Sequence, residues 1–332
     1  MLDLVEAVAA RREASDPDAA TVLRGLSAPQ KSLPSHLFYD ARGSALFEEI
    51  TRLEEYYPTR VETAILDEAA PQIAGRTPQG AVLVEYGSGS SRKTEILLER
   101  LPQLAAYAPI DVSRSALEEA KARLARRFPS LRVEPTLGDF AAPLRLPADL
   151  AIRPRLGFFP GSTIGNFTTP EARDLLGRMA AGLGAGARLV IGADLLKDPS
   201  ILIPAYDDAQ GVTAAFNLNM LERINREFDA DFDRSRFRHE ARFNEAEGRV
   251  EMHLVSLRTQ RVAVLGRMFS FTAGETIHTE NSAKYSMRGF HRLAASAGWT
   301  PKRTWIDRAG LFSVHELAAE VQDFAAGGRV ER

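Results

Sequence analysis

The spacing of hydrophobic positions changes at Ala81. Before it the chain favours helices, beginning with an amphipathic pattern at Leu2, Val5, Val8 and Ala9 that predicts a short helix. After it, short apolar runs alternate with helical patterns. Near-continuous apolar runs predict strands buried on both faces of a parallel sheet. Strands are expected within residues 81–91, 105–113, 131–140, 155–167 and 187–196. Helices are expected at residues 92–101, 114–128 and 169–183. This alternation predicts an α/β fold with a doubly wound sheet and right-handed crossovers.

The alternation of strands and helices stops after Lys197. Residues 199–227 favour helix, residues 236–245 and 249–258 predict a hairpin, and residues 266–274 predict another strand. Residues 287–299 then favour a helix, and residues 300–308 and 310–318 two closing strands. We therefore expect two domains, one of residues 61–198 plus 286–332 and one of residues 1–60 plus the insertion 199–285, with the site in the cleft between the two lobes.

Composition narrows the class of protein. The chain has 332 residues, of which 45% are hydrophobic and 26% charged, as in ordinary globular proteins. Its 42 basic and 44 acidic residues give a net charge of −2, which argues against a nucleic-acid partner. No apolar run reaches the roughly 18 residues of a membrane span, so no membrane partner is expected. The N-terminus has no export signal, which favours a cytoplasmic location.

Metal and thiol chemistry find no support in the sequence. There are no cysteines, which excludes disulfides, zinc–thiolate sites and a cysteine nucleophile. The six histidines show neither H-x-H nor H-E-x-x-H spacing, so no metal site is predicted.

A glycine-rich loop, EYGSGSS from Glu85 to Ser91, lies between a predicted strand and a predicted helix. Glycines there let a ligand approach the backbone, and the helix N-terminus offers unpaired N–H groups. A dinucleotide fingerprint would require glycine at position 92, and so would a P-loop for a nucleoside triphosphate. Arg92 breaks both motifs.

S-adenosylmethionine is the third candidate ligand for the loop. Its methyltransferases carry an acid at the end of the next strand, where Asp111 stands, 24 residues beyond Gly87 (111 − 87). A carboxylate can accept two hydroxyl protons of the ribose. Asp139 and Phe140 follow a third strand and suit the adenine amine and ring. The alternative is that Asp111 caps a helix and that Asp139 belongs to a turn.

A set of longer motifs then resembles one family. They are LPSHLFYDARGSALFEEITRLEEYYPTRVETAIL, EYGSGSSRKT, PIDVS, GDF, FFPGSTIGNF, AYDDAQGVTAAFNLNMLERIN and HTENSAKYS. In this order they closely resemble the histidine Nα-methyltransferases of ergothioneine biosynthesis, from about Leu33 to the C-terminal strands. The resemblance implies a Rossmann-like class I methyltransferase core that binds S-adenosylmethionine, with a second α+β domain for the substrate. It also implies three methyl transfers to L-histidine, through mono- and dimethyl intermediates, to give hercynine.

Site residues follow from the resemblance by position. The cofactor-binding positions are matched by Gly87, Lys93, Asp111, Asp139 and Phe140. The histidine-binding positions are matched by Tyr56, Asn166, Tyr206, Met252, Glu280, Asn281 and Ser282, and Tyr39 matches a tyrosine close to the reacting amine. Position 281 departs from the apolar residue familiar in mycobacterial members, and we expect only a modest effect on recognition of the ring.

The chemistry of these residue types suits the reaction. Asn166 and Tyr206 can donate to the substrate carboxylate, and Glu280 can accept an imidazole N–H. Tyr39 can relay the amine proton, and Tyr39, Phe47 and Phe216 can face the growing cation. The alternatives are a packing role for Tyr39, a turn role for Asn166 and an ion pair of Glu280 with Lys284. Rival functions are methylation of another aromatic amino acid, a P-loop kinase and a binding module without turnover.

Overall fold

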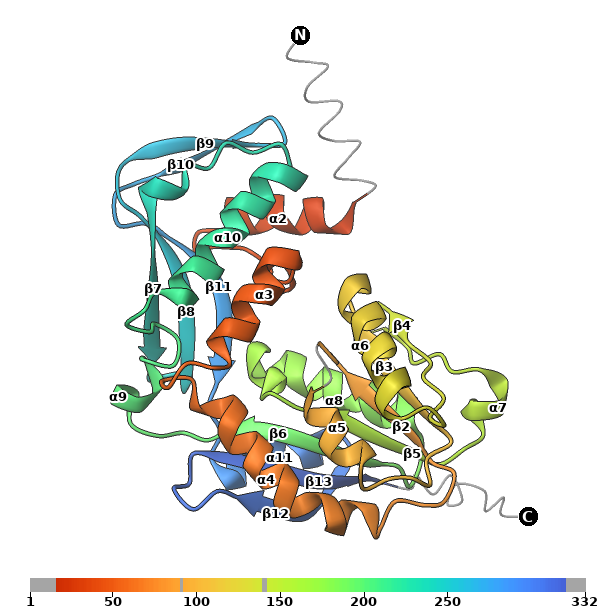
Figure 1. The fold of residues 1–332 in the computed structure, drawn as a ribbon. Helices are drawn as coiled ribbons and strands as arrows, with labels where there is room; N and C mark the ends of the chain where they lie inside the picture. Colours follow the sequence, from red (N-terminus) through yellow and green to blue (C-terminus); the bar gives the residue numbers. More distant parts are fainter. Residues whose placement is uncertain (1–15, 90–91, 139–141, 321–332) are drawn as a thin grey trace, which may run out of the picture. The chain divides into compact units, whose positions relative to one another are not determined.

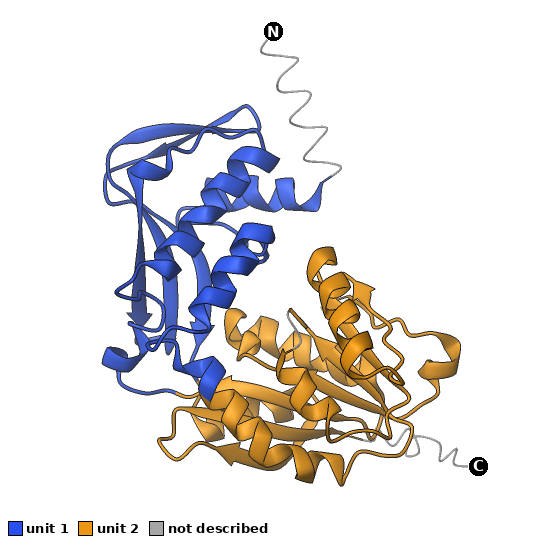
Figure 2. Cartoon of the chain, in the orientation of Figure 1, with its two compact units in different colours: residues 1–60, 196–284 blue, residues 61–195, 285–332 orange. Residues whose placement is uncertain are grey.

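The computed structural model of the chain describes residues 16–89, 92–138 and 142–320. Its contacts divide the chain into two compact units, which Figure 2 shows in two colours. Unit 1 comprises residues 1–60 and 196–284, and unit 2 comprises residues 61–195 and 285–332. The helix predicted at Leu2–Ala9 lies outside the described residues. The assignment of cofactor and substrate to separate domains stays a prediction.

Unit 2 contains a seven-stranded sheet with the order β12-β13-β6-β5-β2-β3-β4 (Figure 1). Its strands are β2 Val82–Tyr86, β3 Ala106–Asp111, β4 Thr136–Leu137, β5 Arg155–Phe159, β6 Arg188–Asp194, β12 Trp299–Ile306 and β13 Phe312–Ala319. The strands from β4 to β6 are parallel, whereas β13 is antiparallel to both of its neighbours. After β2 the chain forms β3 on one side of β2 and later forms β5 on the other side, so the strand order reverses at β2. Ligands of doubly wound sheets bind at the carboxyl ends of the strands beside this switch point.

Helices cover both faces of this sheet. They are α4 Tyr57–Ala74, of which residues from Val61 belong to unit 2, α5 Arg92–Leu98, α6 Arg114–Arg127, α7 Ala148–Ala151, η2 Thr163–Asn166, α8 Thr169–Leu183 and α11 Met287–Ser296. Leu176 of α8 and Phe290 of α11 share one buried cluster with Val84. Leu66 of α4 and Leu97 of α5 share the other with Leu83 and Phe158. Neighbouring residues of β2 thus face opposite cores, and the predicted doubly wound α/β fold is confirmed.

Two predicted strands are shorter in the structure. The prediction of one strand over residues 131–140 is wrong, because of the described residues 131–138 only β4 and a single bridge from Val133 to Tyr107 pair with β3. Pro135 lies between these pairings and has no N–H to donate. The strand predicted over 155–167 ends at Phe159, since Pro160 and the left-handed Gly161 turn the chain into η2.

Unit 1 is an α+β assembly. Its four-stranded sheet has the order β1-β11-β8-β7, and a separate ribbon pairs β9 with β10. The strands are β1 Lys31–Ser32, β7 Phe237–Asn244, β8 Arg249–Ser256, β9 Gln260–Val264, β10 Arg267–Phe271 and β11 Thr276–Ala283. The helices are α2 Pro17–Ser27, η1 Ser35–Phe38, α3 Ala41–Ile50, α9 Pro199–Leu202, α10 Val212–Glu227 and η3 Arg234–Arg236. The β7–β8 hairpin confirms the prediction for 236–258, whereas β9 and β11 were not predicted.

Helix α10 contacts α3, β7 and β8, and β1 pairs in parallel with β11. The N-terminal segment and the insertion therefore share one sheet and one helical layer (Figure 1). Because β1 and β11 are more than 240 residues apart in sequence, this pairing is a long-range contact that local pattern cannot reveal.

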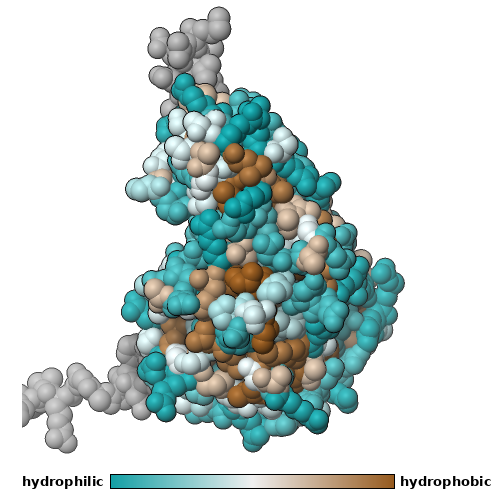
Figure 3. All heavy atoms as spheres, turned by 90° about the vertical axis from the view of Figure 1, so that its left-hand side faces the viewer, coloured by the Kyte–Doolittle hydropathy of each residue, from teal (hydrophilic) through white to brown (hydrophobic). Residues whose placement is uncertain are grey.

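Hydrophilic residues cover much of the face shown in Figure 3, with hydrophobic residues between them. Large apolar side chains that are exposed include Ile152, Ile201 and Leu257. Exposed single apolar residues are ordinary in globular proteins. Within the described ranges, no helix combines the length and apolar character needed to cross a membrane.

The core of unit 2 allows a stability test. Phe158 on β5 is 1% exposed, whereas Ile152 is 86% exposed. Phe158→Ala should lower the free energy of unfolding by about 3–5 kcal/mol, because it removes a large buried side chain and leaves a cavity. Ile152→Ala should change it by less than about 0.5 kcal/mol. Thermal unfolding of both variants beside the wild type measures this, and equal effects would contradict the core assignment.

Candidate active site

The glycine loop of unit 2 is held against the acid at the end of β3. Gly87 and Gly89 have φ angles of +71° and +45°, a region that favours glycine. The amide of Gly87 donates to the carbonyl of Ile110 at 2.9 Å. The amide of Gly89 donates to Asp111 Oδ2 at 2.7 Å, and that of Ser113 donates to Asp111 Oδ1 at 2.8 Å. The predicted ribose-binding carboxylate is thus fixed from both sides.

A second carboxylate lies beneath the loop. Glu85 of β2 is buried and accepts from the hydroxyl of Thr94 at 2.6 Å and from the hydroxyl of Tyr107. Burial raises the pKa of Glu85 to about 8, although both hydroxyl donors act to lower it. Glu85 therefore ties β2, β3 and α5 together below the residues that would meet a ligand.

The residues beside the loop fit a nucleoside ligand. Ser88 is buried, and its hydroxyl has no hydrogen-bond partner among the described residues. A Cβ built on Gly89 would meet nothing within 4 Å in the described part of the chain. A cavity of about 270 Å³ lies at the ends of β3 and β4, lined mainly by apolar residues such as Ile110 and Leu144. Asp139 and Phe140, predicted beside the adenine, lie outside the described residues.

Lys93 lies in the first turn of α5 and is half-buried. Its ammonium donates to the carboxylate of Glu62 at 2.5 Å. Glu62 is buried and also accepts from the amide of Gly161. The predicted cofactor-binding lysine is therefore joined to the start of the loop that follows β5.

The loop after β5 carries Asn166 and is firmly held. Ser162 has a left-handed φ of +55°, and its hydroxyl accepts from the amide of Asp194 at 2.9 Å. The amide of Gly165 donates to the carbonyl of Ser162 at 2.8 Å, and Tyr285 donates to the carbonyl of Ile164 at 3.2 Å. Half-buried Asn166 ends η2, at the carboxyl end of the strand beside the switch point.

In unit 1 a β-bulge decides which side chains of β11 share a face. His278 pairs with His253, but Glu280 pairs with Met252, so Thr279 is the extra residue. The hydroxyl of Thr279 donates to the carbonyl of Met252 at 3.1 Å. Regular alternation would place His278 and Glu280 on one face, and the bulge instead turns Glu280 to the face of Met252. We call the Met252 face of this sheet the inner face.

Three polar side chains meet on the inner face. The hydroxyls of Tyr206 and Ser282 lie 2.7 Å apart, and the ammonium of Lys284 donates to each of them at 2.8 Å. All three residues are buried. Because an ammonium is only a donor, both hydroxyl oxygens accept from it, and their hydrogens point away from Lys284.

Glu280 lies on the same face and is half-buried. Burial raises its pKa to about 7, and the positive charge of Lys284 acts in the opposite direction. The inner face therefore offers a carboxyl acceptor, which is ionised above about pH 7, next to oriented hydroxyl groups. This combination can hold a ring that has both a donor and an acceptor nitrogen.

Aromatic rings of unit 1 form a continuous group. The ring centroids of Tyr39 and Phe47 are 5.8 Å apart, and both lie 6.0 Å from that of Phe216. Tyr56 lies 6.2 Å from Phe47 and 6.3 Å from Tyr206. The sequence-predicted tyrosines and the suggested phenylalanines are thus brought together, from η1, α3, α10 and the adjoining turns.

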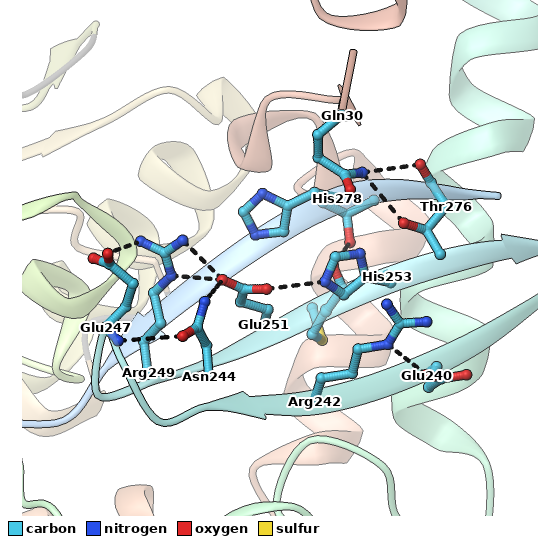
Figure 4. A network of polar contacts seen from close by, with 12 residues as sticks. Gln30, Glu240, Arg242, Asn244, Glu247, Arg249, Glu251, His253, Thr276 and His278 are labelled. Carbon is cyan, nitrogen blue, oxygen red and sulfur yellow. Dashed lines mark hydrogen bonds and ion pairs between the residues drawn. The ribbon is translucent and has the colours of Figure 1, made fainter. Parts of the chain in front are cut away.

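Asn281 pairs with Glu251 and lies on the opposite face of the sheet, which we call the outer face. There its side-chain amide contacts His278. Figure 4 shows the polar network of that face around Glu251 and His253. Burial acts to raise the pKa of Glu251, but hydrogen bonds from Asn244, Arg249 and His253 lower it to about 2. The side chain of Asn281 therefore does not share the face of Glu280 and Ser282, and its contact with a substrate stays a prediction.

Within the described ranges, no group of three or more His, Asp or Glu side chains is arranged to hold a metal ion.

The family model for the histidine-specific, S-adenosylmethionine-dependent methyltransferases matches residues 18–319. The chain belongs to this family. Its α/β unit is the Rossmann-like class I methyltransferase core, and S-adenosylmethionine is its co-substrate. A P-loop kinase and a dinucleotide-binding protein are thereby set aside.

Known relatives of this methyltransferase cover most of its length. It is 43% identical over 300 residues to histidine N-alpha-methyltransferase of Mycolicibacterium smegmatis, covering 88% of this chain and 92% of that protein. It is 42% identical over 305 residues to the protein of the same name from Mycobacterium tuberculosis, covering 90% and 94%. Ergothioneine biosynthesis protein 1 of Neurospora crassa is 31% identical over 327 residues, which are 95% of this chain and 36% of that protein.

From its place four residues after Glu280, Lys284 of this methyltransferase is expected only as an ion-pair partner of that residue. The structure adds its contacts with Tyr206 and Ser282. Strand periodicity at Ser282 and Lys284 would have placed the two on one face, but β11 itself was not recognised as a strand. Lys284 is therefore the polar residue of the inner face that sequence reasoning missed.

The raised pKa of Glu280 predicts a pH-dependent stability. Above the ordinary value of 4.5 an unfolded Glu280 has lost its proton, whereas the folded group holds it to about pH 7. The contribution of Glu280 to the stability of the folded protein should therefore fall as pH rises through this window. The glutamine of Glu280→Gln does not titrate. The melting temperature of this variant, relative to that of the wild type, should therefore rise between about pH 4.5 and 7, and the difference should stay constant above about pH 7.

Thermal unfolding at closely spaced pH values measures the effect. Glu245→Gln, on the exposed turn after β7, removes the same charge without altering the inner face. A constant difference between Glu280→Gln and the wild type across the window would contradict the raised pKa.

Proposed function

We propose that this methyltransferase transfers three methyl groups from S-adenosylmethionine to the α-amine of L-histidine, giving hercynine for ergothioneine biosynthesis. Family membership and the relatives at 42–43% identity support the reaction. The observation that carries the choice of substrate is the inner face of unit 1, where Glu280 lies with Tyr206, Ser282 and Lys284. A cytoplasmic location and the absence of nucleic-acid and membrane partners stay predictions.

On this proposal the cofactor lies along the carboxyl edge of the parallel sheet. Gly87 and Gly89 let the methionine part approach the backbone, and Asp111 accepts the ribose hydroxyls. Lys93 donates to the methionine carboxylate. Asp139 and Phe140 are assigned to the adenine by the family pattern alone.

The imidazole of the substrate has one N–H and one nitrogen lone pair. Glu280 accepts the N–H, and a hydroxyl of Ser282 or Tyr56 donates to the other nitrogen. Tyr206 and Asn166 donate to the substrate carboxylate, and Met252 packs against the side chain. A phenyl ring would leave the carboxylate of Glu280 without its partner, and this disfavours phenylalanine.

Each transfer is an in-line displacement. The lone pair of the neutral amine attacks the methyl carbon, the C–N bond forms, and the C–S bond breaks with its electron pair returning to sulfur. The amine must lose a proton before each of the three transfers, and Tyr39 passes it toward solvent. Holding the two reactants in line contributes up to about 7–11 kcal/mol of the barrier reduction.

The product carries a permanent positive charge on nitrogen. The ring centroids of Tyr39, Phe47 and Phe216 lie 5.8 to 6.0 Å from one another. Aromatic faces attract alkylated ammonium groups by about 0.5–2 kcal/mol each. This group of rings is therefore proposed to hold the intermediates while methyl groups are added.

Mass spectrometry after incubation with S-adenosylmethionine and an equal mixture of the twenty amino acids tests the function. Histidine should gain one, two and three methyl groups. Glu280→Ala should raise the KM for histidine about 10- to 100-fold, because the ring loses a charged acceptor. Glu245→Ala serves as the control. Methylation of another amino acid would overturn the substrate, and no transfer at all would overturn the function.

Tyr39→Phe tests the proton relay. Removing only the hydroxyl should lower kcat by about 100-fold or more, because relay by a positioned group contributes on this scale. The affinity for S-adenosylmethionine and the melting temperature should stay close to those of the wild type. Steady-state kinetics with histidine as the varied substrate measure the loss. An unchanged kcat would assign Tyr39 to packing alone.

A further inference from the structure

One buried carboxylate of unit 2 has no part in the proposed chemistry. Glu62 of α4 is 1% exposed. Its two oxygens accept from the amide of Gly161 at 2.9 and 2.8 Å, and one of them accepts from Lys93 at 2.5 Å. Residues 99 and 31 positions away in the sequence thus converge on one side chain. Because the carboxylate is buried, removing either of its donors would leave part of its charge without a partner.

The surrounding chain leaves room for this carboxylate. Gly192 lies inside β6, and a Cβ built there would lie 2.0 Å from Glu62 Oε1. A glycine in a strand interior often marks such a close approach. Gly161 has a φ of +81° and lies beside the ammonium of Lys93, which would be 3.8 Å from a Cβ. Two glycines therefore shape the space in which Glu62 meets its donors.

The two hydrogen-bond partners of Glu62 belong to segments that the proposed function assigns to two different ligands. Lys93 stands in the first turn after the glycine loop, where the proposed function places the methionine carboxylate. Gly161 begins the loop that ends at Asn166, which is assigned to the carboxylate of the amino acid. The lysine ammonium sits on a flexible four-carbon stem, so a fixed partner is needed to hold it in one place.

We propose that Glu62 is a positioning residue that holds Lys93 for the cofactor and the Gly161–Asn166 loop for the amino acid through a single buried carboxylate. The inference rests on the proposed roles of Lys93 and Asn166. Pairing with Glu62 also neutralises a lysine charge beside a cofactor that itself carries a sulfonium cation.

Binding of S-adenosylmethionine by calorimetry, without histidine, tests the cofactor half. Glu62→Gln keeps an acceptor for Gly161 but removes the charge that holds Lys93, so the affinity should fall about tenfold or more. Lys93→Met should weaken binding as well. In that background Glu62→Gln should add little, because the two residues act through one interaction.

Gly192→Ala tests the same geometry without altering either charged group. The new methyl must displace the Glu62 carboxylate, so this variant should reproduce the loss of cofactor affinity and raise the KM for histidine. Gly177→Ala is the matched control, since a Cβ on Gly177 of α8 meets nothing within 4 Å in the described part of the chain. It should bind and turn over like the wild type.

The outcomes separate this inference from the function itself. Unchanged cofactor affinity in folded Glu62→Gln, or independent effects of Glu62→Gln and Lys93→Met, would overturn the positioning role. If Glu62→Gln weakens cofactor binding but the wild type methylates no histidine, the function fails and the cofactor half of the inference stands. A wild type that binds no S-adenosylmethionine would overturn both.

Discussion

Buried carboxyl groups that accept hydrogen bonds hold segments together at and beneath the carboxyl edge of the parallel sheet. A carboxyl group removed from water needs donors that replace its hydration, so each one fixes the segments that supply its donors. The three sets are Asp111 with Gly89 and Ser113, Glu85 with Thr94 and Tyr107, and Glu62 with Gly161 and Lys93. The sets of Asp111 and Glu62 join the core to loops next to the proposed ligands, and the set of Glu85 joins β2, β3 and α5 beneath them. The sheet thereby gives the loops a rigid support.

In unit 1 the buried charged group that needs hydrogen-bond partners is a cation. Lys284 is buried directly after β11 and donates to the hydroxyls of Tyr206 and Ser282, while its charge opposes the rise in the pKa of Glu280. Donor and acceptor groups are thus placed side by side on one face. The neighbouring rings of Tyr39, Phe47 and Phe216 supply apolar surface of the kind that an alkylated amine prefers. On the proposed function, recognition of the ring and of the amine falls to different chemical groups.

The spacing of hydrophobic residues predicted most strands and helices of the core of unit 2. Continuous apolar runs predicted β2, β3, β5 and β6, and helical spacing predicted α5, α6, α8 and α11, because both elements are buried along a period that the sequence displays. β11 was missed because its sequence TIHTENSA is largely polar and has no apolar alternation. The strand expected over 131–140 was too long, since pattern does not weigh the missing N–H of Pro135.

The sequence alone determined the fold class, the family and the residue types of the site, because these depend on local periodicity and on motifs that are contiguous in the chain. The tertiary structure alone decided which of those residues share a surface. The bulge at Thr279 separates Glu280 and Ser282 from Asn281 and places the former with Lys284, and Glu62 meets Lys93 and Gly161 from distant segments. Such groupings depend on strand register and on the packing of α4, and these arise from contacts between residues far apart in the sequence.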